Sequence, residues 1–196
     1  MPPRAAIAGA ALLALGVAGV AAGTPFSEVT RLERPGGQPG DVFGASTAIS
    51  SDGSHALVSS LYVFNATNGI GQVSAFDRMS PGWVLDGELT PPWSSQYFGA
   101  ALAMDAAGTR ALVGSPASHA VGAIATTQRT ASGWGDAVED SPPTPYLGSF
   151  GNAVGISADG MTAVVGAPGM APGGAVMYAR QGGAWVPTAT LDPPSG

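Results

Sequence analysis

The chain of 196 residues has a formal net charge of −6, and only 10% of its residues are charged. Its seven cationic side chains are all arginines and form no basic cluster. The sequence therefore lacks the positively charged surface that a nucleic-acid-binding protein needs. Cysteine is absent, so an exported chain has no disulfide and is held together by packing alone. With 30 glycines, 17 prolines and 45% hydrophobic residues, the composition predicts many short strands joined by turns and argues against disorder.

The N-terminal residues 1–23 have the pattern of a secretory signal peptide. Arg4 precedes an apolar run over residues 5–23, and the small residues that end the run offer a cleavage site near Gly23. We expect this segment to be removed on export, which leaves a secreted or cell-surface protein with no stable membrane span. The alternative is a retained membrane anchor, because the run is close to anchor length; however, it is mostly alanine and glycine, and the next cation is Arg31.

A lone strand is predicted over residues 26–32, ahead of a set of repeats. Its sequence, FSEVTRL, matches the segments that begin at Trp83 and Trp185, since in all three an aromatic residue is followed six positions later by leucine. The segment therefore resembles the last strand of a repeat that lacks its other strands.

Three diverged copies of one unit fill the rest of the chain. Each copy opens with Phe-Gly, and each then carries a glycine, an arginine and a tryptophan that recur at a spacing of 51 residues. Periods of this size indicate supersecondary units stacked on one another. The Phe-Gly pairs begin at Phe43, Phe98 and Phe150, and the recurring residues are Gly71, Gly122 and Gly173, Arg78, Arg129 and Arg180, and Trp83, Trp134 and Trp185.

Each unit predicts four strands. The first is short, made of small apolar residues, and ends in a turn whose glycine supplies a positive φ. The second is a continuous apolar run, as expected for a strand covered on both faces, and the third alternates more. The fourth begins at the recurring tryptophan and ends near a proline pair. The first three strands are expected at 45–50, 55–59 and 72–78, at 100–104, 110–114 and 123–129, and at 152–157, 162–166 and 174–180.

Four strands in a unit of this length are typical of a β-propeller blade. The predicted fold is all-β, with three four-stranded antiparallel blades plus one extra strand, an incomplete or open propeller. The expected divisions are a signal peptide at 1–23, an extra strand and linker at 24–42, and blades at 43–92, 93–145 and 146–196.

The Phe-Gly openings, together with Gly166-Ala167-Pro168 after an apolar strand, resemble the FG-GAP repeat of integrin α-subunit propellers. The second copy reads Gly114-Ser115-Pro116, and the first reads Ser59-Ser60-Leu61, which departs from the motif. The resemblance implies a secreted or surface propeller, usually of about seven blades. The kelch repeat is the alternative, because the third copy also has a double glycine, a tyrosine and a tryptophan; it too would form a propeller.

Many FG-GAP proteins hold calcium in a loop between the second and third strands, but the three corresponding loops here contain no carboxylate. They read LYVFNATNGI, ASHAV and GMAP. Hard cations prefer several oxygen ligands, mostly carboxylates, so we expect no calcium, no other metal and no cofactor.

Three blades leave two sheet faces uncovered. The sequence is consistent with a fragment of a longer propeller, with closure by self-association, and with an open stack of sheets.

Carboxylates occur in three settings. Asp52 and Asp159 stand before a turn glycine, where turn chemistry accounts for them. Asp86 and Glu88 lie two apart on a strand and are expected on a solvated outer strand, although paired carboxylates can also perform glycoside chemistry. The densest acidic cluster, a solvated loop or a weak cation site, is Asp136, Glu139 and Asp140.

The residues that perform nucleophilic or metal chemistry have no recognisable context. His55 and His119 occupy unrelated positions in their copies and have no cysteine partners. Ser59 and Ser115 lie in no G-x-S-x-G motif. We therefore predict no catalytic residue and no enzyme.

The preferred contact surface is the longest loop, with Tyr62, Phe64 and Asn68, and Asn65 in the same loop begins a glycosylation sequon. The predicted function is a secreted or cell-surface module that binds a protein or glycan ligand in adhesion. The alternatives are a scaffold or accessory domain of a larger secreted hydrolase and a fragment with no activity of its own.

Overall fold

The computed structural model describes residues 30–63, 70–91, 97–140, 143, 148–169 and 173–193. The chain divides into two compact units, 1–31 and 32–196, and the fold below belongs to the second. The predicted signal peptide at 1–23 lies outside the described residues.

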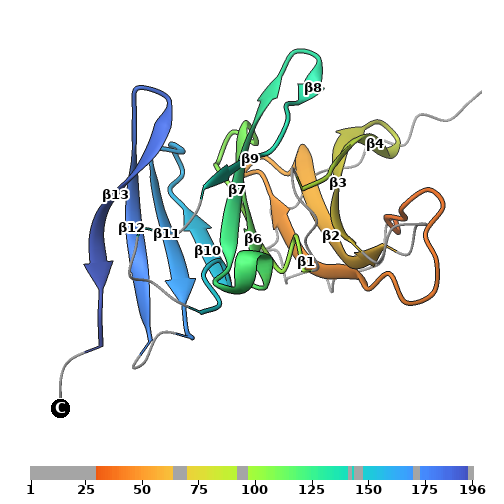
Figure 1. Cartoon of the computed structure of the whole chain (residues 1–196). Coiled ribbons are helices and arrows are strands. Elements are labelled where there is room, and N and C mark those ends of the chain that lie inside the picture. The colour runs from red at the N-terminus through yellow and green to blue at the C-terminus, as the bar shows by residue number, and fades with distance from the viewer. Residues whose placement is uncertain are drawn as a thin grey trace, which may run out of the picture. The chain divides into compact units, whose positions relative to one another are not determined.

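The strands form three antiparallel sheets that follow one another along the chain (Figure 1). This arrangement confirms the predicted all-β class and the division into four-stranded units. The first sheet contains β1 (Phe43–Ile49), β2 (His55–Val63), β3 (Ile70–Met79) and β4 (Gly82–Leu89). The second contains β5 (Ala101–Met104), β6 (Arg110–Ser115), β7 (Ala123–Thr130), β8 (Gly133–Trp134) and β9 (Val138–Asp140), with the 3-10 turn η1 (Ser118–Ala120) between β6 and β7. The third contains β10 (Ala153–Ile156), β11 (Thr162–Ala167), β12 (Gly174–Gln181) and β13 (Ala184–Leu191).

The described residues contain thirteen strands, the number that the sequence predicts, but the extra strand is not the expected one. Residues 30–32, the described end of the predicted lone strand, have no strand structure. The additional strand arises because the outer strand of the second sheet is split into β8 and β9, both of which pair with β7. A further difference is that β2 continues past its predicted end at Ser59 as far as Val63, since Ser60 pairs with Gln72.

The recurring residues have two roles, one within each sheet and one between neighbouring sheets. Arginine and tryptophan of each copy lie directly opposite each other at the outer hairpin, as in the pair Arg180 and Trp185. The recurring glycine marks a backbone crossing: a Cβ built on Gly71 would lie 2.2 Å from the carbonyl oxygen of Phe98, and one on Gly122 would lie 2.2 Å from that of Phe150. Only glycine lets the opening Phe-Gly segment of the next copy pass at this distance.

Alternate side chains of each strand point to the two opposite faces of its sheet, as the period of a strand requires. We call the side toward the following copy the forward face. In the first sheet it consists of Leu57, Val73, Ala75 and Leu89, which pack in one buried cluster with Phe98, Leu102, Ala111, Val113 and Ala125 of the second copy.

The forward face of the second sheet contributes Leu112 and Ile124 to a second buried cluster. Their partners in the third copy are Phe150, Ala163, Val165, Ala167, Val176 and Tyr178. The second sheet therefore has a core on both of its faces, in agreement with its continuous apolar strand β6.

Candidate functional site

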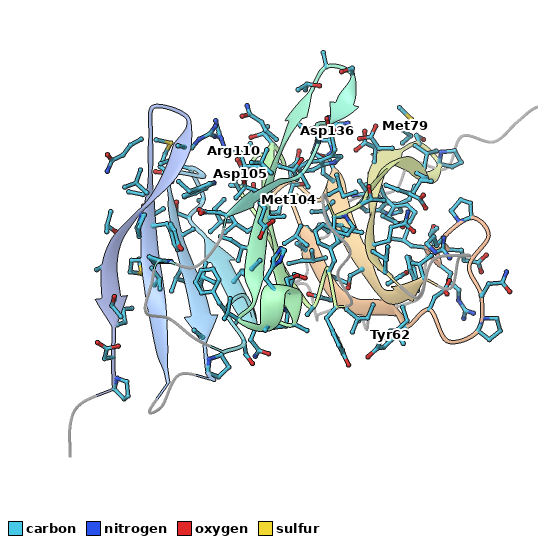
Figure 2. The ribbon with its side chains drawn as sticks, viewed as in Figure 1. Tyr62, Met79, Met104, Asp105, Arg110 and Asp136 are labelled. Atoms are coloured by element: carbon cyan, nitrogen blue, oxygen red, sulfur yellow. The ribbon has the colours of Figure 1, made fainter. Side chains whose placement is uncertain are left out.

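Two adjoining hollows of about 470 and 560 Å³ lie between the outer strands of the second sheet and the β12–β13 hairpin of the third. Thr126, Val138, Gly183 and Trp185 line both of them, so we describe them together as the outer groove. Figure 2 shows Arg110 and Asp136, which line one end, at the upper edge of the sheets. The remaining lining residues that carry polar side chains are Thr127, Gln128, Thr130, Glu139, Asp140 and Arg180.

The outer groove exists because the outer strand of the second sheet is interrupted. β4 and β13 are each 8 residues long, whereas β8 and β9 have 2 and 3 residues. At the break, the Thr127 hydroxyl donates a hydrogen bond of 2.7 Å to the Gly135 carbonyl, and the Gly135 N–H donates to the Gln128 carbonyl at 3.0 Å. These bonds replace the regular ladder and leave room beside β7.

Asp140, the residue that ends β9, also distinguishes the outer groove from the interface between the first and second sheets. Asp140 is paired with Ile124 in the register that Leu89 has with Val73 in the first sheet. Leu89 is buried in the forward face, so a carboxyl group occupies an apolar core position here. Burial raises the pKa of Asp140 above its ordinary value, and the negative charge of Glu139 adds to the shift.

The outer groove presents both donors and acceptors. Arg110 lies 3.4 Å from the Asp105 carboxylate, and Arg180 donates to the Gln128 side chain at 3.2 Å. The Glu139 carboxylate lies 3.2 Å from Nε2 of His119. Guanidinium groups can only donate hydrogen bonds and ionised carboxylates can only accept them, so the outer groove can bind a ligand rich in hydroxyl groups.

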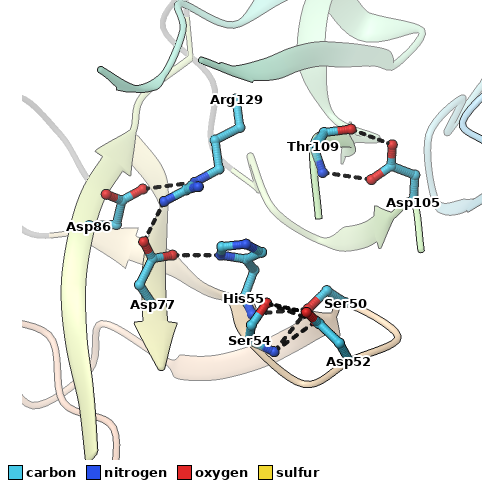
Figure 3. Close-up of polar contacts among 9 residues, drawn as sticks. All are labelled: Ser50, Asp52, Ser54, His55, Asp77, Asp86, Asp105, Thr109 and Arg129. Atoms are coloured by element: carbon cyan, nitrogen blue, oxygen red, sulfur yellow. Dashed lines mark hydrogen bonds and ion pairs between the residues drawn. The ribbon is translucent and has the colours of Figure 1, made fainter. Parts of the chain in front are cut away.

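The interface between the first and second sheets has an ion-pair network at the position that corresponds to the outer groove (Figure 3). Arg129 pairs with Asp77 and lies 3.3 Å from Asp86, while Asp77 lies 2.7 Å from Nδ1 of His55. The prediction of a solvated Asp86 is therefore wrong, because its carboxylate is paired with Arg129. Asp86 lies where the register between β3 and β4 shifts, opposite Ala75 and Phe76. Glu88 is exposed, as expected, and accepts a hydrogen bond from Gln72.

The difference between the two interfaces follows from the two positions of the repeat that supply the carboxylates, since the counterpart of Asp86 is Ala137. Arg180 corresponds to Arg129, but the residue that corresponds to Asp77 is Gln128. The arginine of the third copy consequently binds a neutral amide and keeps its place beside the groove.

The carboxylates at the turns have the structural role that the sequence predicts. Asp52 accepts hydrogen bonds from the Ser50 hydroxyl at 2.6 Å and the Ser54 N–H at 3.0 Å (Figure 3), and these hold the pKa of Asp52 well below its usual range. The Ser157 hydroxyl and the Met161 N–H lower the pKa of Asp159 in the same way.

Asp105 is a turn carboxylate that sequence reasoning missed. It is 2% exposed and accepts bonds from the Thr109 N–H at 2.7 Å and the Thr109 hydroxyl at 2.8 Å. The only available signal was its alignment with Ser50 of the first copy, whose hydroxyl also accepts backbone N–H groups across its turn.

Tyr62, the one predicted contact residue that the structure describes, does not line the outer groove. Tyr62 lies on β2, its ring packs edge-on against Tyr97 with centroids 5.4 Å apart, and its pKa is raised chiefly by a hydrogen bond with Tyr97. Figure 2 places Tyr62 at the lower edge of the sheets, away from Arg110 and Asp136. Phe64, Asn65 and Asn68 lie outside the described residues.

Of the predicted acidic cluster, Asp136 lines one hollow and Glu139 and Asp140 line the other. Sequence reasoning assigned no role to Arg110 and treated Trp185 only as a recurring residue that begins the fourth strand of its copy. In the described part of the chain, no group of three or more histidines and carboxylates is placed to hold a metal ion. The same residues include no helix long and apolar enough to cross a membrane.

No protein-family model matches the chain, and no curated protein matches it. Among solved structures, hydrazine synthase of Kuenenia stuttgartiensis is similar with a TM-score of 0.52 and 18% identity, over 83% of this chain and 38% of that one. The periplasmic gluconolactonase PpgL of Pseudomonas aeruginosa has a TM-score of 0.48 and 12% identity, over 78% of this chain and 58% of that one. The chain thus spans less than two thirds of either protein, and the likeness to the first shows the fold alone: three propeller-like blades.

Proposed function

We propose that the protein is a secreted or cell-surface FG-GAP-like propeller module that binds a glycan in the outer groove. The observation that carries the proposal is the combination of a tryptophan, two arginines and three carboxylates around one open groove. Binding sites commonly combine an apolar or aromatic wall with a few convergent polar groups.

Each part of the groove suits a sugar. Trp185 offers an aromatic surface on which the C–H face of a pyranose ring can pack, and its rigid side chain loses little entropy on binding. Arg180 and Gln128 supply N–H donors at one end, and Glu139 and Asp140 supply acceptors at the other. Because charges of both signs line the outer groove, a neutral or weakly charged glycan fits better than a strongly acidic or basic chain.

The FG-GAP part of the proposal rests on the repeat itself. The opening phenylalanine and the recurring glycine are the two partners of one backbone crossing, which is seen at both interfaces. A role in adhesion follows from the resemblance to integrin-type propellers and from the predicted signal peptide.

The test is a glycan array followed by titration calorimetry with the secreted protein. Trp185→Ala is expected to weaken binding of the best glycan tenfold or more, which corresponds to about 1.4 kcal/mol. Trp83→Ala is the matched control, because Trp83 has the same place in the first copy but does not line the outer groove. Unchanged affinity for Trp185→Ala would refute the proposal.

A second pair of variants separates ligand contact from loss of folding. Arg180→Gln removes a groove donor and is expected to lower affinity several-fold, whereas Arg78→Gln changes the corresponding exposed arginine of the first copy and is expected to have no effect. Thermal unfolding of all four variants shows which of them stay folded. Release of reducing sugar during the titration would favour the hydrolase alternative instead.

A further inference from the structure

A third hollow, of about 340 Å³, adjoins the outer groove across the break in the outer strand of the second sheet. It lies between the first and second sheets and is lined by residues 88–91, at the end of β4, and by residues 134–137, which lead from β8 into β9. We call it the flanking hollow. Gly135 and Asp136 line both the flanking hollow and the outer groove, so the two spaces meet at the short segment between β8 and β9.

The flanking hollow contains the recurring tryptophan of the second copy, as the outer groove contains that of the third. Trp134 and Trp185 each lie directly opposite the recurring arginine of their copy at the outer hairpin. Both indoles are half-buried: Trp134 packs against the cluster between the first and second sheets, and Trp185 packs against the cluster between the second and third. The core therefore holds each ring in place, and each ring also lines a space within or above the range of about 300–1,000 Å³ that ligand pockets occupy.

The charged groups of the flanking hollow are acceptors. Glu88 and Asp136 supply them, and the described residues that line this hollow include no cation. Glu88 accepts a hydrogen bond of 2.7 Å from the Gln72 side chain, but an ionised carboxylate has about four acceptor positions and can accept further hydroxyl groups. Asp136 is exposed at the point where the two spaces meet. An uncharged sugar can donate to both carboxylates, whereas a sugar acid would bring a second negative charge beside them.

Gly135 contributes no side chain to the boundary between the two spaces. Its carbonyl and its N–H are already hydrogen-bonded to Thr127 and Gln128, so its backbone is satisfied without a ligand. A molecule that extends from one space to the other therefore crosses a stretch of backbone and passes the Asp136 carboxylate. The outer strands of the first and third sheets, β4 and β13, run for 8 residues each and have no such break.

We infer that the ligand of the outer groove is a linear, uncharged glycan that continues into the flanking hollow, with one sugar unit on Trp185 and a later unit of the same chain on Trp134. The inference rests on the proposed function and adds the length and the charge of the ligand. A linear polysaccharide repeats its sugar unit, and the two tryptophans occupy the same position in successive copies of the protein repeat. The two spaces therefore bind successive parts of one chain.

The test compares short and long members of neutral glycan series by titration calorimetry. The probes are the disaccharides and hexasaccharides of cellulose, xylan, mannan and chitin. In the series that binds, the hexasaccharide is expected to bind about tenfold more tightly than the disaccharide, because only the longer chain reaches both tryptophans. Trp134→Ala is expected to remove this gain and to leave the affinity for the disaccharide, which is bound in the outer groove, unchanged.

A second variant avoids the truncation of a residue that packs against the core. Thr90 is exposed and lines the flanking hollow, so Thr90→Trp is expected to fill the hollow and to remove the same gain. Val84→Trp is the matched control, because Val84 is an exposed residue of β4 that lines neither space, and this variant is expected to keep the gain. Binding of the disaccharide by each variant shows that it is folded.

Failure of this inference and failure of the proposed function give different results. If Trp185→Ala weakens binding but Trp134→Ala and Thr90→Trp leave the gain of the hexasaccharide intact, the ligand stays within the outer groove and the inference is wrong, although the proposed function stands. If no probe binds, or if Trp185→Ala changes neither affinity, the proposed function itself fails. Tighter binding of the galacturonic acid hexasaccharide than of every neutral one would overturn the assignment of an uncharged chain.

Discussion

The close approach of Gly122 to Phe150 predicts a large loss of stability for Gly122→Ala. A residue with a strained positive φ costs about 1–3 kcal/mol, and Gly122 has a φ of +92°. In addition, the new Cβ would lie 2.2 Å from the Phe150 carbonyl oxygen and 2.5 Å from its nitrogen, so the backbone of Phe150 must move.

The size of this second effect follows from the burial of Phe150. Its side chain is fully buried in the core cluster between the second and third sheets, and truncation of a buried phenylalanine costs about 3–5 kcal/mol. If the displacement loses half of that packing, Gly122→Ala costs about 2 kcal/mol beyond its strain, a large share of the stability of about 5–15 kcal/mol of a typical domain.

Gly133→Ala is the matched control, because Gly133 has a φ of +104° but no neighbour within 4 Å of a built Cβ. Urea unfolding of both variants measures the difference, provided that the m-value does not change. If Gly122→Ala costs no more than Gly133→Ala, the backbone crossing does not join the sheets as described.

Three further predictions concern the core, the ion pairs and the turns. Leu112→Ala opens a cavity between the second and third sheets and is expected to lower the free energy of unfolding by about 2–5 kcal/mol, measured in urea. Asp77→Asn removes the carboxylate shared by His55 and Arg129 and is expected to cost about 1–3 kcal/mol, while Gln128→Ala at the next interface costs less. Asp159 has a pKa below its ordinary 3.8 in the folded chain, so its stabilising effect is present above that pH and is lost as the pH falls through the lowered value. Asp159→Asn is therefore expected to flatten the fall in the urea midpoint below pH 4, and an unchanged acid profile would contradict this assignment.

The repeat made the fold predictable from sequence. Phe-Gly, the glycine that it crosses, and the arginine and tryptophan of the outer hairpin recur because each copy meets the same neighbour, so their spacing reports the stacking of sheets. The turn glycines at 53, 108 and 160 have φ values of +68°, +68° and +66°, as the hairpins require. These residues can be recognised within a single copy, even where the other residues of the copies differ.

The outer groove was less predictable, because it depends on departures from the repeat. Asp140 breaks the leucine pattern, which was visible in the sequence, but its consequence depends on the break in the strand at Gly135. The first copy has Asp77 where the second has Gln128, and this difference affects the groove because the arginine of the following copy contacts that side chain. Such contacts join residues about one repeat apart, and no local pattern indicates them.

The most direct test of the outer groove is hydrogen exchange with and without the best glycan of the array. The proposed function predicts slower exchange of backbone amides at residues 135–140 and at the β12–β13 hairpin, with no change at the corresponding β3–β4 hairpin of the first sheet. Protection confined to the end of β2 around Tyr62 would contradict a ligand site in the outer groove and would place binding on the loop that the sequence alone favours.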